Sequence, residues 1–186
     1  TEAPELPDTT LTSSCYSYMF SGCNSLTEPP ALPATTLSSY CYSHMFYNCT
    51  SLTTAPELPA TTLAESCYSH MFYGCTSLTV APELPATTLA WACYSHMFYN
   101  CTSLTTAPKL LATTLVSYCY FYMFRNCTNL NRITMLATNI NAEKCLNIWV
   151  YNVSSSGTFV KSHFMTSLPS GESGIPTGWE INNISP

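Results

Sequence analysis

Residues 55–78 read APELPATTLAESCYSHMFYGCTSL, and close copies of this stretch recur along the whole chain. The cysteines mark the period of the recurrence. All eleven fall into two rows with a step of 26 residues, namely Cys15, Cys41, Cys67, Cys93, Cys119 and Cys145 in the first row and Cys23, Cys49, Cys75, Cys101 and Cys127 in the second. The chain therefore consists of five copies of one unit and the degenerate start of a sixth, which predicts a stack of coils.

Each unit contains a part that excludes helix and a part that allows it. Pro56 and Pro59 exclude helix from the start of the unit and favour extended backbone. Residues 64–72 include neither Gly nor Pro, and apolar residues recur there every four positions, so the pattern predicts about two turns of helix. Gly74 suits the left-handed backbone conformation that commonly ends a helix. Asparagine takes the equivalent place at Asn48, Asn100 and Asn126.

A short strand is expected to follow, beginning at Ser77-Leu78-Thr79 with Leu78 pointing into the core. A period of 26 lies in the range of leucine-rich repeats. We therefore expect an α/β solenoid of leucine-rich-repeat coils of about 26 residues, each with a short strand, a proline-bounded turn and a short helix. No coil can bury its apolar residues alone, so stacking supplies the core.

The repeat pattern weakens towards the end of the chain. Residues 131–139 keep little of the motif, and two later stretches, 157–161 and 174–181, resemble short strands joined by a Gly/Ser/Pro loop. We divide the chain into a solenoid over residues 1–150 and a C-terminal β-cap over residues 151–186, since the last apolar layer of a solenoid needs a cover. The chain starts in repeat phase at Thr1, which predicts that it belongs to a longer protein.

Composition excludes several partners. Only 8% of the residues are charged and the net charge is -5, which argues against nucleic acid because phosphate binding needs clustered cations. The sequence includes no run of about 18 apolar residues, so it predicts no transmembrane segment. No cofactor motif is present, and we expect no cofactor.

The cysteines and histidines are the candidates for metal or redox chemistry. Both cysteine rows lie on the apolar stripe, so we expect mostly buried, reduced thiols packed as small hydrophobes. A spacing of C-x7-C is poor support for zinc. His44, His70 and His96 share one repeat position and predict a stacked row, for which a polar aromatic position on the outer face is a simpler interpretation than a metal site.

No catalytic constellation emerges, and we predict no enzyme. Glu57 and Glu83 share one position, and two stacked carboxylates could suit a glycosidase. Nothing marks either as the acid, and Lys109, next in the same row, is expected to pair with Glu83 at the surface.

Periodic tyrosines and threonines are the candidate binding residues. An exposed tyrosine row offers a large, rigid contact area at low entropic cost, and threonines can add hydroxyls. The candidates are Tyr47, Tyr73, Tyr99, Thr53, Thr79 and Thr105.

The pattern L-P-x-T-x-L…C-Y-x-x-M-F-x-x-C-x-S-L resembles the BspA-like (Treponema-type) leucine-rich repeats, with Met-Phe where that repeat usually has Ala-Phe. The tail from Ser156 through Trp179 is similar to the C-terminal segment of such surface proteins in gut Bacteroides and relatives. The resemblance implies an exported or cell-surface bacterial protein, with adhesion to host matrix or to other bacteria as its role. It supplies no catalytic residues and no cofactor.

The leading hypothesis is therefore an exported or cell-surface module that mediates protein–protein adhesion to host or microbial surface proteins. A carbohydrate- or mucin-binding module is one alternative, favoured if the aromatic rows line a groove and not a convex face. A structural spacer in a larger surface protein is another, and it predicts no binding by this chain.

Overall fold

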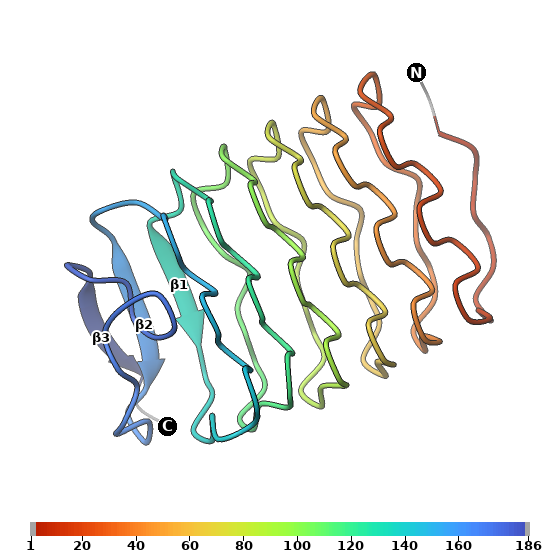
Figure 1. Cartoon of the computed structure of the whole chain (residues 1–186). Helices are drawn as coiled ribbons and strands as arrows, with labels where there is room; N and C mark the ends of the chain where they lie inside the picture. Colours follow the sequence, from red (N-terminus) through yellow and green to blue (C-terminus); the bar gives the residue numbers. More distant parts are fainter. Residues whose placement is uncertain (1–2, 185–186) are drawn as a thin grey trace.

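The computed structural model describes residues 3–184, so the repeat-phase start at Thr1 and Glu2 and the last two residues of the expected cap, Ser185 and Pro186, lie outside the described residues. The chain winds into coils that stack side by side along one axis (Figure 1). Successive coils repeat at the 26-residue step, as the family of stacked pairs from Phe20–Phe46 to Phe98–Phe124 shows. The solenoid expected from the repeat is therefore present.

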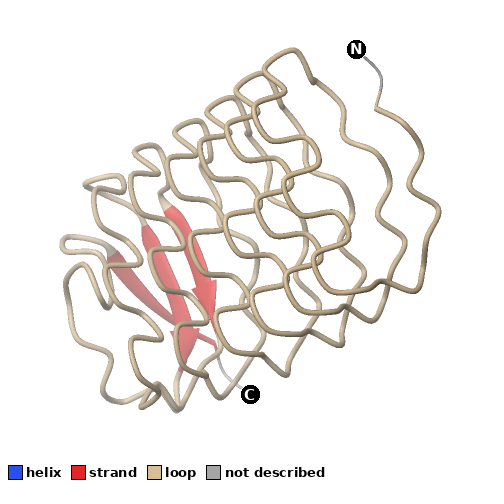
Figure 2. Cartoon of the chain, turned by 45° about the vertical axis from the view of Figure 1, so that its right-hand side comes forward, coloured by secondary structure: helices blue, strands red, loops and turns tan. Residues whose placement is uncertain are grey.

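The expected helix over residues 64–72 is wrong: the described residues form no helix (Figure 2). Consecutive tight turns take its place. The N–H groups of Cys67, Ser69 and Met71 donate to carbonyls three residues earlier. The N–H groups between them, those of Tyr68 and His70 among them, instead donate to carbonyls of the next coil. We call residues 64–75, with their equivalents in other coils, the turn column.

Left-handed residues explain why the turn column is not a helix. In the coil of Cys67, φ is positive at Ser66, His70 and Gly74, at +50°, +57° and +72°. An α-helix needs φ near −63° at every position, so a left-handed residue every fourth position interrupts it, and alternate N–H groups point to the next coil instead.

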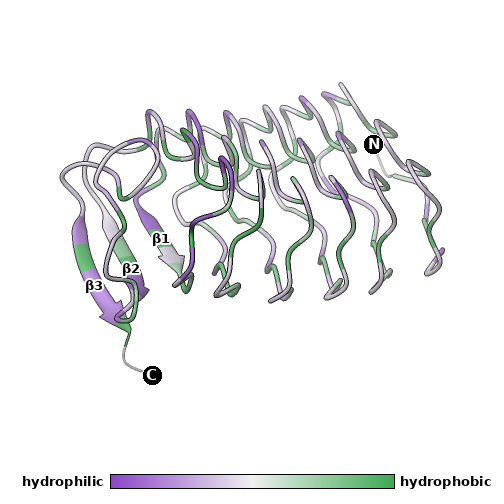
Figure 3. Cartoon of the chain, turned by 60° about the horizontal axis from the view of Figure 1, so that its bottom comes forward, coloured by the Kyte–Doolittle hydropathy of each residue, from purple (hydrophilic) through white to green (hydrophobic). Residues whose placement is uncertain are grey.

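The core consists of side-chain ladders that run along the stack. Phe46, Phe72 and Phe98 are fully buried, and their ring centroids are 5.6 Å apart. A second ladder of buried tyrosines runs beside it, with Tyr68 and Tyr94 at 5.8 Å. Hydrophobic segments recur at the same place on successive coils (Figure 3). Burial of each ring depends on the coils on both sides of it.

The cysteine rows belong to this core, as expected. Nine of the eleven cysteines are buried and all are free, whereas Cys15 and Cys23 in the first coil are exposed. The thiol of Cys75 donates to the carbonyl of Phe46 at 3.1 Å, and Cys101 repeats the bond to Phe72. Burial raises the pKa of the Cys67 thiol to about 12, so this thiol stays protonated and unreactive at neutral pH.

Regular strands form only at the C-terminal end. β1 (Arg132–Met135), β2 (Thr158–Ser162) and β3 (Glu180–Ile184) make a parallel sheet in that order. In earlier coils the expected strand shrinks to single bridges such as Thr54↔Val80. Proline explains the difference: Pro82 and Pro108 lack an N–H for the ladder, whereas Thr134 occupies the equivalent position in β1.

The tail continues the β-pairing between successive coils as a regular parallel sheet. A separate β-cap is not confirmed. β2 matches the strand expected at 157–161, but the second expected strand forms later, as β3. Arg132 lies opposite Thr158, and Thr158 opposite Glu180. The buried Trp149 packs against Phe124, the last ring of the phenylalanine ladder. Its indole N–H donates to the carbonyl of Gly174 at 2.9 Å. The division of the chain at residue 150 stays a prediction.

Over residues 3–184 there is also no helix that is long and apolar enough to cross a membrane.

Candidate functional site

The three candidate tyrosines lie together in a groove. The rings of Tyr47 and Tyr73 stack at 4.7 Å, and those of Tyr73 and Tyr99 at 4.5 Å. With the histidine row they line a groove of about 640 Å³, which we call the aromatic groove. Its lining residues are Tyr18, His44, Tyr47, His70, Tyr73, His96, Tyr99, Tyr122 and Arg125.

The histidines form the second row of this groove. The rings of His44 and His70 stack at 4.3 Å, and those of His70 and His96 at 4.2 Å. A serine holds each ring: the hydroxyl of the preceding residue lies 2.8 Å from Nδ1 of His44 and of His70, and 2.9 Å from that of His96. The other nitrogen of each ring is left for the groove or for solvent.

Sequence reasoning did not bring the histidine and tyrosine rows together. The sequence feature that could have predicted their pairing is the spacing of three residues between His70 and Tyr73, which recurs in the neighbouring coils. His70 is left-handed and lies in a turn that is closed by the bond from the N–H of Tyr73 to the carbonyl of His70, so both side chains emerge on one face. The ring centroids of the two are 5.9 Å apart.

The three histidines of this row are neutral at physiological pH. Burial, with a contribution from the two neighbouring rings, lowers the pKa of His70 from 6.5 to about 3. Burial likewise lowers the pKa of His96 to about 4, with help from His44 and Arg125, and it lowers the pKa of His44. The described residues include no group of three or more His, Cys, Asp or Glu side chains that could hold a metal ion.

We predict that acid destabilises the fold through this row. Between about pH 6.5 and about pH 4, these histidines bind protons in the unfolded chain but stay neutral in the folded one. The free energy of unfolding therefore falls as pH falls. The triple variant His44→Tyr, His70→Tyr, His96→Tyr uses the residue that the chain itself has at Tyr18 and Tyr122. Thermal unfolding from pH 7.5 to pH 4 should show a smaller loss of Tm in this variant. An equal loss in both proteins would contradict the assignment.

The threonine candidates lie elsewhere. Thr53, Thr79 and Thr105 are exposed, and none of them lines the aromatic groove. The hydroxyl of Thr79 donates to the carbonyl of Thr53 at 3.3 Å, so part of its hydrogen-bonding capacity is used between coils. The threonine row stays a prediction as a binding surface.

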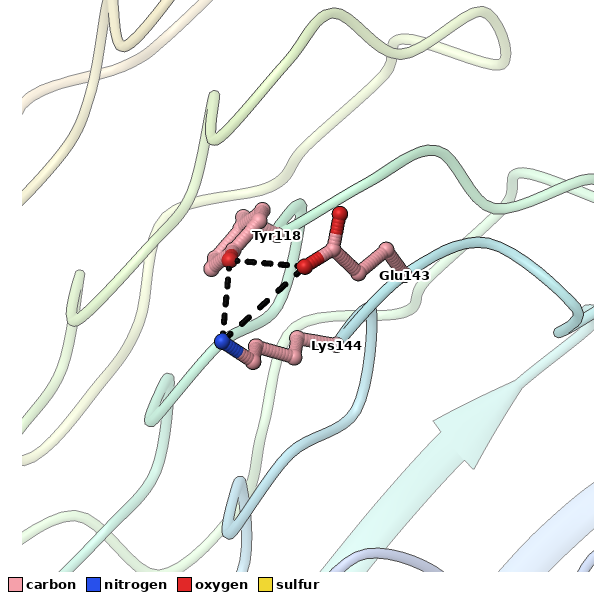
Figure 4. A network of polar contacts seen from close by, with 3 residues as sticks. All are labelled: Tyr118, Glu143 and Lys144. Carbon is pink, nitrogen blue, oxygen red and sulfur yellow. Dashed lines mark hydrogen bonds and ion pairs between the residues drawn. The ribbon is translucent and has the colours of Figure 1, made fainter.

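The expected pairing of Lys109 with Glu83 is absent. Within residues 3–184 the only ion pair joins Lys144 to Glu143, at 3.9 Å. Tyr118 bridges the two, since its hydroxyl donates to Glu143 and accepts from Lys144, each at 3.1 Å (Figure 4). The side chains of Lys144 and Glu143 are largely exposed, so the network contributes little to stability.

A second groove of about 570 Å³ shares the histidine row with the first. Trp91, which is 47% exposed, lines it together with Tyr118 and Phe121. Four of the serines that line it, Ser43, Ser66, Ser69 and Ser95, are buried. The chain thus presents two adjacent grooves separated by a neutral histidine row.

One family model matches the chain, that of the BspA type leucine rich repeat region. It matches in six copies, over residues 4–107 and 40–164. No curated protein and no solved structure matches.

Proposed function

This chain belongs to the BspA-type leucine-rich-repeat family, and from that premise we propose that it is an exported or cell-surface module for adhesion to host or microbial surface proteins. Repeats of this family suggest a protein-interaction module. The surface on which we place the interaction is the aromatic groove. The observation that carries this choice is the pairing of two stacked polar-aromatic rows along one side of the solenoid.

The chemistry of the groove suits a polypeptide backbone. Tyrosine hydroxyls donate and accept, and neutral imidazoles do so too, so the rows can pair with peptide N–H and C=O groups in turn. The rings are held in register by stacking, which lowers the entropy lost when a partner binds. Tyrosine and arginine are also enriched at protein interfaces. Of the nine lining residues only Arg125 is charged at neutral pH.

A carbohydrate or mucin ligand is the second candidate, because the aromatic rows do line a groove. Sugar rings usually pack against exposed aromatic faces. Here the faces of Tyr73 are covered by Tyr47 and Tyr99, with interplanar angles of 14° and 8°, so the row offers edges and hydroxyls. This geometry favours the protein partner. We also propose that the module binds without catalysing a reaction, since the groove lining includes no carboxylate.

The test is a binding screen of the protein against immobilised fibronectin, fibrinogen and mucin and against a glycan array. We expect saturable binding to a protein, reduced at least about tenfold in the variant Tyr47→Ser, Tyr73→Ser, Tyr99→Ser. The matched control is Thr53→Ala, Thr79→Ala, Thr105→Ala, which changes an equally periodic row outside the groove and should bind as the wild type does.

Loss in the threonine variant alone would move the site to that row. Binding to glycans and not to proteins would support the carbohydrate alternative. A folded protein that binds nothing would support the spacer role and overturn the proposal.

A further inference from the structure

Arg125 interrupts the tyrosine row of the aromatic groove. It occupies the repeat position of Tyr47, Tyr73 and Tyr99, and Tyr151 resumes the row one coil later. The centre of its guanidinium group lies 5.8 Å from the ring centroid of Tyr99 and 4.9 Å from that of Tyr151. The ring of Tyr122, which extends the histidine row, is a third neighbour at 4.9 Å. Three aromatic rings from three coils therefore hold this side chain in place.

No carboxylate neutralises this cation within the described residues. The only ion pair of residues 3–184 is that of Lys144 with Glu143. The Nε atom of Arg125 is buried and has no hydrogen-bond partner. A buried donor without an acceptor is unfavourable, and such a group in a folded protein requires an explanation. Cation–π contacts offset part of that cost through the faces of the guanidinium. Because Nε is buried, a group from a partner can reach only the terminal Nη groups of Arg125 at the groove.

The groove has the length of a short extended peptide. Its lining residues run from Tyr18 in the first coil to Arg125 in the fifth, which is four inter-coil steps. With about 4.8 Å between neighbouring coils the groove is about 19 Å long, and an extended chain rises about 3.3 Å per residue, so about six residues span it. Along this length the side chains are neutral, and the single cation lies at one end.

We propose that Arg125 binds a carboxylate side chain, an Asp or a Glu, at one end of an extended segment of the protein partner that lies along the aromatic groove. The two terminal Nη groups of the guanidinium present parallel N–H donors that match the two oxygens of a carboxylate, and such charge-assisted pairs are about twice as strong as neutral hydrogen bonds. The neutral rows then pair with the rest of the segment. This inference rests on the proposed function, because it names the chemistry of the partner at the same groove.

The experiment uses a library of N-acetylated, C-amidated hexapeptides in which one position at a time is fixed as Asp, Glu, Asn or Gln. The wild-type protein should prefer the acid over its amide by about tenfold or more at one end of the peptide and nowhere else. Arg125→Tyr restores the residue of the row, so it should keep the fold and lose the preference. Arg132→Gln, which removes the other arginine from an exposed site on β1, should keep the preference.

NMR of the arginine side chains gives an independent readout, because the chain has only two arginines. The Nε–Hε signal that disappears in Arg125→Tyr identifies Arg125, and the signal of Arg132 serves as an internal reference. Titration with N-acetyl-aspartate amide should shift the first signal in a saturable way and leave the second in place. Equal, non-saturating shifts of both signals would overturn the proposal.

Three further outcomes separate this inference from the proposed function. Binding to a protein in the screen, with no preference for acidic peptides, overturns the carboxylate site and leaves the proposed function standing. Binding to sialylated glycans that is lost in Arg125→Tyr, with no acidic peptide preference, assigns Arg125 to an acidic sugar and overturns the peptide proposal. An acidic preference that persists in Arg125→Tyr overturns the role of Arg125 alone.

Discussion

Replacing Phe72 by alanine is expected to lower the free energy of unfolding by about 3–5 kcal/mol. The ring is fully buried and stacks at 5.6 Å on Phe46 and on Phe98. Its removal leaves a cavity between two coils that each depend on their neighbours for burial, and the backbone hydrogen bond from Phe72 to Met97 limits collapse. Urea unfolding followed by circular dichroism measures the effect.

Phe20 provides the matched control for this variant. It occupies the same repeat position in the first coil, is 7% exposed and has only one ladder neighbour, Phe46. Phe20→Ala should therefore cost clearly less than Phe72→Ala. Equal costs would mean that neighbouring coils do not determine burial in this ladder, and a near-neutral Phe72→Ala would contradict the core assignment.

Replacing Gly157 by alanine is expected to cost about 3 kcal/mol, at the upper end of the range for overpacking. A Cβ atom at this position would come within 2.3 Å of the carbonyl oxygen of Asn131, which belongs to the backbone and cannot rotate away. That oxygen also accepts the N–H of Thr158 at 2.8 Å, the first bond between the start of β2 and the coil before it. The variant should loosen β2 from β1, visible as faster hydrogen exchange in β2.

Gly22 separates this steric effect from the cost of a left-handed backbone. Its φ is +74°, but a Cβ atom there would meet nothing within 4 Å. Gly22→Ala should therefore cost only about 1–2 kcal/mol, the penalty of an L-residue in the left-handed region. If Gly157→Ala were no worse than Gly22→Ala, the contact with Asn131 would not constrain the sheet.

Much of the architecture follows from local sequence. The 26-residue step places equivalent residues on neighbouring coils, so the buried phenylalanine, leucine and cysteine rows could be predicted from the repeat alone. The left-handed positions at Asn48 and Gly74 were also readable, because these are the residue types that tolerate positive φ. Proline predicted the lack of helix before residue 60.

The turn column could not be predicted in the same way. Residues 64–72 satisfy the local rules for a helix, and nothing in them forbids it. Their alternate N–H groups instead bond to carbonyls about 25 residues away, as in the bond from His70 to Ser95 at 2.9 Å. Propensity counts only local bonds, so it misses a backbone whose partners lie in the next coil.

The candidate site shows the same division. The tyrosine row was visible as a repeat position, whereas the pairing of His70 with Tyr73 across one groove depended on the turn geometry. The surroundings of Arg125 involve Tyr99 and Tyr151, each one coil away from it. By itself, the sequence determined the period, the apolar rows and the family of the chain, because these depend on the order of residue types. Only the tertiary structure decided the turns, the groove and the unpaired guanidinium, because each is built from bonds and contacts between coils.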